Sequence, residues 1–448
     1  MKKTFAVLLA VAMVFSLVAC GGSSSSTSTS TTTTTTAATS SANTEPAVEV
    51  GQVVTGVEAV DTVAQDGKDY NHMTMEELYE LAKAEGGTIE VYSTTTDANT
   101  AVKKFLKAYP DIPIEYITID TNQAIPKFQT EYDTNNIFAD VAFVADKSGE
   151  IYNELVQYGI LEVYYPATVV AHMDPESVKY GLPVYASFNP WYYNTAKFPD
   201  GVPCQSWWDI VQGYNVDTCS YIDASGKNTQ YWTLYTKDIT SPSYAALWAQ
   251  LFLDSDELAA QYKAQYGEDL VITYNDKLKN DPDVMTLPED NAGIELFWRF
   301  SQMVSTELDD GDAVVTAVED SLNGPTLGLC SSGKIDGAEN VAWLTGMKPY
   351  TATNGASNMY VAAGCDNPAG ARLFIMFCMG GDDGKSGCYE AWDKIGHWSM
   401  RDDYEMVKTP MTKEEVGLKD PDFAGIYDLY PNVKAYWTYW HSLAPQTK

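Results

Sequence analysis

The feature that most constrains the fold of this chain is a regular alternation of short apolar strands with amphipathic helices between residues 74 and 159. β-branched and aromatic residues predict strands in three segments, at residues 88–92, 114–119 and 140–144. Helical spacing bounded by Gly or Pro predicts the helices around them, at residues 74–85, 105–109, 125–132 and 151–157. This order predicts an α/β fold with a mostly parallel sheet and helices on both faces. Ligands of such sheets bind at the carboxyl ends of the strands.

The size and charge of the chain limit its partners. About 380 residues follow position 69, which is enough for two lobes rather than one core. The formal net charge of -33 argues against binding to nucleic acid or to an anionic membrane surface. A pocket can still carry local positive charge, so the class of small-molecule ligand stays open.

The N-terminus has the pattern of a lipoprotein signal peptide at residues 1–20. Lys2 and Lys3 precede an apolar stretch at residues 5–18, which is shorter than the ~20 residues that span a bilayer. The stretch ends in Leu17-Val18-Ala19-Cys20. This ending resembles the bacterial lipobox, in which the cysteine is lipidated and becomes the first residue of the mature protein. An ordinary signal peptide with a chance cysteine is the alternative.

The segment after Cys20, residues 21–68, begins with a long Ser/Thr-rich run that has little to bury. We therefore predict a disordered tether. A coil of about 45 residues typically spans about 35–40 Å. The expected location is the outside of the cell membrane, held by the lipid alone, and so long a spacer favours a Gram-positive-type cell.

Six cysteines follow Cys20, and none forms a C-x-x-C pair, which disfavours a zinc ribbon or thioredoxin motif. An even number of cysteines in an exported protein permits disulfides. The first pairing we expect is Cys204 with Cys219, and Cys378, in an apolar run, is expected to be a buried thiol. The pairing of the remaining cysteines is open: Cys330, Cys365 and Cys388.

Three segments near the start of the folded region, residues 86–94, 102–116 and 139–143, follow one another in a familiar order. They resemble the opening of type 2 periplasmic binding proteins, the extracellular solute-binding subunits of ABC importers, in the iron(III), thiamine, polyamine and organophosphate branch of that family. Residues 182–194 resemble the first crossing between lobes, and residues 202–209 resemble the Pro-x-Ser/Thr-Trp-x-Asp step after it. Residues 360–375 resemble the segment in which the chain of this family returns from the second lobe to the first. The resemblance therefore spans about residues 86–400.

The resemblance implies two Rossmann-like α/β lobes with a ligand cleft between them, which close by hinge motion. Lobe one is expected at about 69–190 and 346–448, and lobe two at about 195–345, within a solute-binding domain at residues 69–448. Residues 211–237 and 254–290 are expected to be insertions. The implied function is capture of a small solute and its delivery to the permease subunits of an ABC transporter, with no catalysis and no cofactor.

Candidate ligand residues follow the predicted strands or precede helices. Ser93, Thr94 and Thr95 lie between a strand and a helix, where hydroxyls and free N–H groups make an anion site, and Thr240 and Ser241 precede an apolar helix in lobe two. Ordinary helix capping is the alternative for both groups.

Other candidates come from the strand ends, the crossing and a late loop. Asp146 follows a strand directly and binds an amine or a hydroxyl, or else caps a helix. Ser187, Trp191 and Tyr193 lie in the crossing, where the aromatic rings stack on a ligand or pack in the core. Arg401 could clamp a phosphate or carboxylate, and its alternative is an ion pair with a nearby acidic residue.

The residues favour an organic ligand that is anionic or rich in hydroxyl groups. Iron-binding relatives use an adjacent Tyr pair with His and carboxylate ligands. The pairs Tyr164-Tyr165 and Tyr192-Tyr193 lie too early in the chain, and none of the four histidines lies in the first strand loop. No metal ligand is therefore assigned, and an iron(III)-binding protein is the alternative.

Two other functional classes are less favoured. No G-x-S-x-G or H-E-x-x-H motif is present, so a secreted hydrolase has no positive sign. Gly384-Lys385-Ser386 lacks the P-loop glycine, which is replaced by Met379. A surface adhesin is disfavoured by the strand–helix alternation and the absence of repeats.

Overall fold

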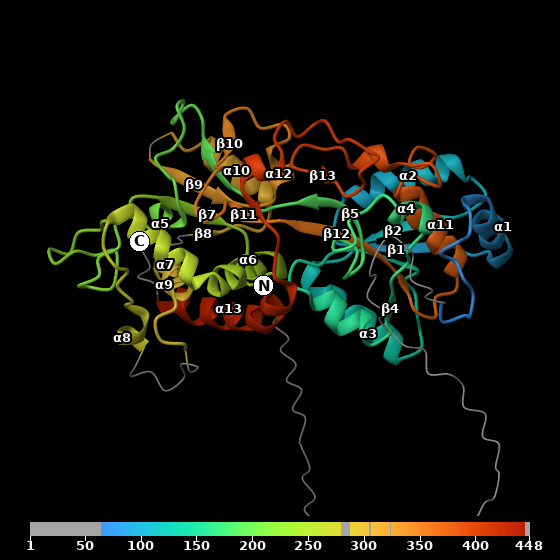
Figure 1. Ribbon diagram of the computed structural model, residues 1–448, viewed down its shortest axis with the longest axis horizontal. Helices are drawn as coiled ribbons and strands as arrows, with labels where there is room; N and C mark the ends of the chain where they lie inside the picture. Colours follow the sequence, from blue (N-terminus) through green and yellow to red (C-terminus); the bar gives the residue numbers. More distant parts are fainter. Residues whose placement is uncertain (1–63, 279–286, 304–305, 323, 444–448) are drawn as a thin grey trace, which may run out of the picture. The chain divides into compact units, whose positions relative to one another are not determined.

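Two mixed β-sheets organise this protein in the computed structural model, which describes residues 64–278, 287–303, 306–322 and 324–443 (Figure 1). The first sheet has seven strands in the order β13-β5-β12-β3-β1-β2, with β4 paired to β12. The second has five in the order β10-β6-β9-β7-β8, and β11 pairs with β14. A mixed α/β fold is therefore confirmed.

The strands of the first sheet are β1 (Ile89–Ser93), β2 (Ile114–Thr118), β3 (Val141–Ala145), β4 (Leu161–Glu162), β5 (Leu182–Ser187), β12 (Gly355–Ala362) and β13 (Trp398–Ser399). Those of the second sheet are β6 (Trp191–Asn194), β7 (Thr233–Thr236), β8 (Thr306–Glu307), β9 (Thr326–Leu329) and β10 (Val341–Trp343). The short pair is β11 (Ala352–Thr353) with β14 (Leu418–Lys419).

The helices of the first half are α1 (Met75–Glu85), α2 (Asp97–Ala108), α3 (Thr121–Asp133), the π-helix η1 (Tyr152–Val156), α4 (Ala167–Val170), α5 (Trp207–Ile210), α6 (Pro242–Leu253), α7 (Ser255–Tyr266) and α8 (Tyr274–Leu278). Those of the second half are α9 (Ala292–Ser301), α10 (Gly311–Glu319), the 3-10 helix η2 (Ser332–Ile335), α11 (Pro368–Cys378), the 3-10 helix η3 (Tyr389–Trp392), α12 (Lys413–Val416) and α13 (Phe423–Leu443).

The predicted strand–helix alternation is confirmed at the start of the fold. β2, β1 and β3 are parallel neighbours, whereas β12 runs antiparallel to β3 and to β5. The helix predicted at residues 151–157 is present as the π-helix η1, which is two residues shorter than predicted.

The first helix is held by a capping box. The Thr74 hydroxyl accepts a hydrogen bond from Glu77 N at 3.2 Å, and the Glu77 carboxylate accepts one from Thr74 N at 2.8 Å. The helix ends at Gly86, whose φ of 70° lies in the left-handed region that glycine adopts without strain.

Thr74→Ala is expected to lower the free energy of unfolding by about 1 kcal/mol, because it leaves helix N–H groups without an acceptor. Urea denaturation followed by circular dichroism measures the change. Thr74→Ser keeps the hydroxyl and is expected to match the wild type, so an equal loss in both variants would contradict the capping argument.

The chain crosses between the two main sheets twice. Residues 188–190 join β5 to β6, which confirms that residues 182–194 are a crossing, and the segment from β10 through β11 returns to β12. β7, at the end of the segment predicted as an insertion at residues 211–237, is a strand of the second sheet.

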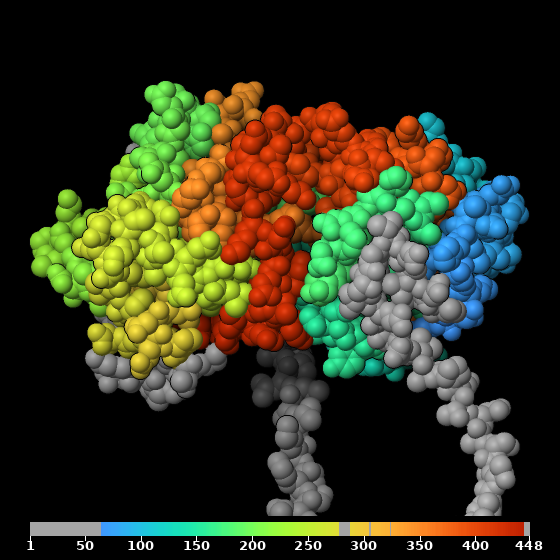
Figure 2. Space-filling view, viewed as in Figure 1, coloured from blue at the N-terminus to red at the C-terminus, as the bar shows by residue number. Residues whose placement is uncertain are grey.

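The C-terminal helix α13 packs in the core of the second lobe. Trp437 and Trp440 contact Phe297 of α9, with ring centroids 5.8 and 6.0 Å apart. In Figure 2 the C-terminal segment, in red, lies against the yellow-green segment around residue 250, which holds α6. We expected residues 346–448 to belong to lobe one, and α13, at the end of that range, packs its aromatic face against α6 and α9.

The same helix also contacts the first lobe. Tyr430 Oη donates a hydrogen bond to Glu150 Oε1 at 2.5 Å, and Lys434 Nζ lies 3.6 Å from the same oxygen. Glu150 lies five residues after β3, in the helical turn that leads into η1. α13 therefore links the second core to the end of a strand in the first sheet.

The predicted disulfide between Cys204 and Cys219 is wrong. Cys204 is buried, and its thiol donates a hydrogen bond to the backbone oxygen of Ser206 instead. Cys378 is fully buried at the end of α11, as its apolar run had led us to expect.

The predicted signal peptide, Cys20 and nearly all of the predicted tether lie outside the described residues. The tether was predicted to run to residue 68, but residues 64–68 already contact the folded body. Gln65 Nε2 donates to Gly159 O at 3.0 Å, and Tyr70 Oη donates to Asp66 Oδ2 at 2.6 Å. Across the described ranges, no helix combines the length and apolar composition needed to cross a bilayer.

Candidate functional site

The loop after β1 is held by its own hydroxyl groups. Ser93 is fully buried, and its Oγ donates to Phe143 O at 2.8 Å and to Thr95 O at 3.0 Å. Thr94 Oγ1 accepts from Ala145 N at 3.4 Å, which ties the loop to the end of β3. Thr95 Oγ1 lies 3.3 Å from Asp97 N at the start of α2 and keeps part of its surface exposed. Thr94 and Thr95 are both partly exposed, and Thr95 is the member of this predicted trio that lies beside the Tyr185 hydroxyl.

Tyr185 of β5 lies at the centre of a polar cluster. Its ring stacks on His397, with centroids 3.9 Å apart and planes 9° from parallel. Thr95, Asp97 and Ser357 interact with its hydroxyl. Burial raises the pKa of Tyr185, so the phenol stays neutral. The neutral phenol can therefore both donate and accept hydrogen bonds within this cluster.

His397 is neutral and has a fixed tautomer. Burial lowers the pKa of His397, although the nearby Asp97 carboxylate opposes this effect. Nδ1 lies 3.1 Å from the backbone oxygen of Trp392, which can only accept, so Nδ1 carries the proton. Nε2 is left as an acceptor, and the glycine at position 333 approaches it from the second lobe.

Lys147 supplies an ammonium group at the same strand ends. It follows β3 by two residues, and its side chain crosses the face of Gly355, the first residue of β12. A Cβ at position 355 would lie 2.7 Å from Lys147 Cε, so glycine is needed there to leave room. Burial lowers the pKa of Lys147 to about 8, although the side chain is not fully buried.

The Lys147 ammonium has no hydrogen bond or ion pair with any described residue. The other lysine close to His397, Lys394, forms an ion pair with Asp97. An unpaired charge that has lost most of its water is costly, and a ligand anion would offset that cost. We call Thr95, Asp97, Lys147, Tyr185, Ser357 and His397 the strand-end cluster.

Among the other predicted ligand residues, Ser187 lies nearest to this cluster. It ends β5, is 8% exposed and pairs with Gly355 across the sheet. Asp146 precedes Lys147 but caps η1, since its carboxylate accepts from Tyr152 N at 3.0 Å. Burial raises the pKa of Asp146 to about 6. The capping alternative for Asp146 therefore matches the structure.

Trp191 and Arg401 are occupied by internal contacts. Trp191 is fully buried in the second core, with its ring edge-to-face on Trp207 and Phe300. Arg401 forms a two-bonded ion pair with Asp403, at 2.8 Å for each bond, and donates to a backbone oxygen. We therefore leave both out of the proposed site.

The remaining predicted residues lie in the second lobe, apart from the cluster. Tyr193 is partly buried against the second core. Thr240 Oγ1 donates to Asp238 at 2.6 Å, and Ser241 precedes α6 without a side-chain capping bond. Pro242 occupies the first turn of α6.

Most of the strand-end cluster was missed from the sequence. The sequence did contain a signal for Lys147, because a residue that follows a predicted strand is a candidate ligand residue. Ser357 and His397 had none, since they come from segments more than 160 residues beyond β5 and reach the cluster only through the antiparallel β12 and the loop before β13.

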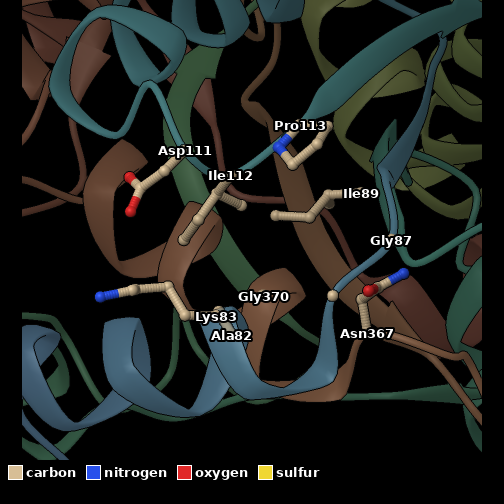
Figure 3. A pocket seen from close by; sticks show the side chains of 10 residues that line it. Ala82, Lys83, Gly87, Ile89, Asp111, Ile112, Pro113, Asn367 and Gly370 are labelled. Atoms are coloured by element: carbon tan, nitrogen blue, oxygen red, sulfur yellow. The ribbon is translucent and has the colours of Figure 1, made fainter.

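A hollow lies at the opposite end of these strands, where β1 and β2 begin. It has a volume of about 200 Å³ and is lined by residues before β1 and β2 and at the start of α11. Figure 3 shows Lys83 and Asp111 at one side and Asn367 at the other. Asp111 accepts from Tyr79 Oη at 2.7 Å, and Asn367 bonds to Asp140 and to Thr88 O. Its polar groups are satisfied, so it is the weaker candidate.

The fold defines the class of protein. Two α/β lobes joined by two crossings, with polar groups at the strand ends, are the architecture of type 2 periplasmic binding proteins, and solved structures of that class match the chain.

The chain belongs to the family of bacterial extracellular solute-binding proteins, whose sequence profile matches residues 100–420. It is a solute-binding protein of an ABC transporter, and it acts outside the cell or in the periplasm. The family is non-catalytic, so the prediction that the chain is not an enzyme is confirmed. No sequence among the curated proteins matches the chain.

Three solved structures show the likeness in fold. AfuA from Actinobacillus pleuropneumoniae, with fructose-6-phosphate bound, has 16% identity and a TM-score of 0.53, over 80% of this chain and 100% of that one. Iron-bound HitA from Pseudomonas aeruginosa has 14% identity and a TM-score of 0.54, over 79% and 99%. The apo ferric ion-binding protein A of Pasteurella haemolytica has 12% identity and a TM-score of 0.53, over 81% and 100%.

Proposed function

We propose that this protein captures a small organic solute that is anionic and rich in hydroxyl groups, and delivers it to the permease of an ABC transporter. The unpaired Lys147 ammonium carries this proposal. The net charge of the chain is -33, so acidic side chains are abundant, and yet none of the described ones pairs with this partly buried cation. An anionic group on the solute would supply the missing partner.

The other members of the strand-end cluster suit the rest of such a solute. The hydroxyls of Thr95, Tyr185 and Ser357 and the free nitrogen of His397 can donate to or accept from solute hydroxyls. These groups come from β5, β12 and the loops after β1 and η3, so they surround a common position. AfuA holds fructose-6-phosphate, which has both an anionic group and hydroxyls.

Iron(III) is the second candidate, because HitA is an iron-bound protein of the same fold. The strand-end cluster opposes it. A lysine ammonium repels a metal cation, and burial raises the pKa of Tyr185, which disfavours a tyrosinate ligand. Tyr192 is also unsuited, since its hydroxyl donates to Ser331 O and Ser332 O.

The proposed lobes are residues 64–187 with 355–403, and residues 191–343 with α13. Closing the lobes over the solute would remove Lys147 and its bound anion from water and so strengthen their interaction.

A binding screen tests the solute class. The purified protein would be titrated calorimetrically with sugar phosphates, hydroxylated carboxylates, neutral sugars, polyamines and ferric citrate. We expect binding from the anionic hydroxylated compounds, without turnover. Binding only to polyamines would refute the solute class, and binding to ferric iron without an organic anion would favour the iron alternative.

The proposed lipid anchor at Cys20 has its own test. Cys20→Ala is expected to move the protein from the membrane fraction to the medium, because one acyl-modified residue is the only proposed attachment. Fractionation and labelling with a fatty-acid analogue measure the change. Cys219→Ala, which keeps Cys20, is expected to remain with the membrane. Membrane retention of the Cys20 variant would refute the anchor.

A further inference from the structure

Two buried thiols lie side by side at the ends of a glycine-rich loop in the first lobe. Cys378 is the last residue of α11, and Cys388 directly precedes η3. Their relative exposures are 0% and 1%. Cys388 N donates to Phe377 O at 2.8 Å, which brings the two backbone segments together, and the two thiols are within hydrogen-bonding reach of each other.

We propose that Cys378 and Cys388 form a disulfide in the exported protein. The protein acts outside the cell or in the periplasm, where disulfides persist. Two other buried cysteines have backbone partners instead of a second thiol. Cys204 Sγ donates to Ser206 O, and Cys330 Sγ donates to Gly311 O.

The oxidant is a disulfide-containing oxidoreductase or a small-molecule disulfide. One cysteine thiolate attacks a sulfur of that disulfide, forms a mixed disulfide and expels one thiolate. The second cysteine thiolate then attacks the protein sulfur of the mixed disulfide, which forms the Cys378–Cys388 bond and expels the second thiolate. The two cysteines lose two protons and two electrons, and the oxidant takes up the electrons.

The bond forms before the core closes. Burial raises the pKa of the Cys378 thiol, so little thiolate exists in the folded protein, and both sulfurs are shielded from an external oxidant.

The crosslink would hold a loop that has many conformations when unfolded. Gly380, Gly381 and Gly384 have φ of 96°, 71° and 74°, in the left-handed region. In the folded protein the loop is held at its start and near its middle: Met379 O accepts from Arg401 Nη1 at 2.9 Å, and Asp382 accepts from Met75 N at 3.1 Å. A disulfide across it would stabilise the fold by limiting the unfolded chain.

Peptide mapping tests the bond directly, because Lys385 lies between the two cysteines. The full-length protein would be refolded in a glutathione and glutathione disulfide buffer, unfolded, alkylated and digested with trypsin. We expect residues 373–385 and 386–394 to appear as one crosslinked species that separates on reduction. Two separately alkylated peptides without reduction would overturn the proposal.

Thermal unfolding with and without reductant separates the bond from simple packing. Reduction is expected to lower the melting temperature of the wild type by about 2–4 °C. Cys378→Ser and Cys388→Ser are expected to lose this response, while the control Cys365→Ser keeps it. A wild type that does not respond to reductant, with variants destabilised equally in both conditions, would show a packing role only and overturn the proposal.

Discussion

Lys147→Met is expected to lower the affinity for an anionic hydroxylated solute about 100-fold, which corresponds to about 2.7 kcal/mol. A charge-assisted hydrogen bond in a partly dry site has a strength of this order. Methionine keeps the aliphatic length that crosses Gly355, so the variant removes the charge with little change in packing. Isothermal titration calorimetry measures the loss.

The same variant is expected to stabilise the ligand-free protein. The pKa of Lys147 is lowered from its ordinary 10.5 to about 8, so holding the charged form costs the folded state free energy at pH 7. After allowance for the partial exposure of the side chain, the gain is on the order of 1–3 kcal/mol. Urea denaturation would show it. Weaker binding together with higher stability distinguishes a binding residue from a structural one.

Lys413→Met is the matched control. Burial also lowers the pKa of Lys413, but Lys413 faces Asp420, Glu414 and Asp174 and lies on α12, away from the strand-end cluster. The affinity of the Lys413→Met variant for the solute is expected to equal that of the wild type. Equal binding by the Lys147 variant and the wild type would refute the proposed site.

Raising the pH from 7 to 10 is expected to weaken binding of the same solute by about 100-fold. The solute anion binds the protonated ammonium, and the pKa of Lys147 in the free protein is about 8. Affinity should therefore be constant below pH 8 and fall up to tenfold for each pH unit above it. A solute whose own charge is constant over this range, such as a sulfate ester, isolates the effect.

The same rise in pH that weakens solute binding should increase the contribution of Lys147 to the stability of the ligand-free protein. Between pH 8 and 10.5 the unfolded chain binds the Lys147 proton and the folded chain does not, so the contribution of Lys147 to stability rises with pH. The nearby charged pair is Asp97 with Lys394, and burial lowers the pKa of His397, so His397 stays neutral throughout. A Lys147→Met protein with the same pH-dependent binding as the wild type would contradict this assignment.

The sequence predicted the first lobe well because its signals are local. The capping box at Thr74, the apolar strands and the glycines between them act over a few residues. The end of β3 was also placed correctly, and it carries the key lysine.

The rest depended on contacts between distant segments. Trp191 had the residue type and position of a ligand contact, but the aromatic residues of lobe two enclose it. Arg401 is bound to Asp403, the alternative that two neighbouring acidic residues had suggested. The position of α13 in the fold could not be predicted from the pattern of its own residues. Its position is set by packing against the aromatic side chains of α6 and α9.

The contact between α13 and Glu150 makes this protein a natural scaffold for an optical sensor. Glu150 lies three residues after Lys147, and Tyr430 of α13 is hydrogen-bonded to it. A dye attached through a cysteine at the exposed position Ala435 would sit one turn from that contact, outside the strand-end cluster. Its emission would test whether solute arrival at Lys147 is transmitted to the helix, in a reagent that needs no substrate turnover and no permease.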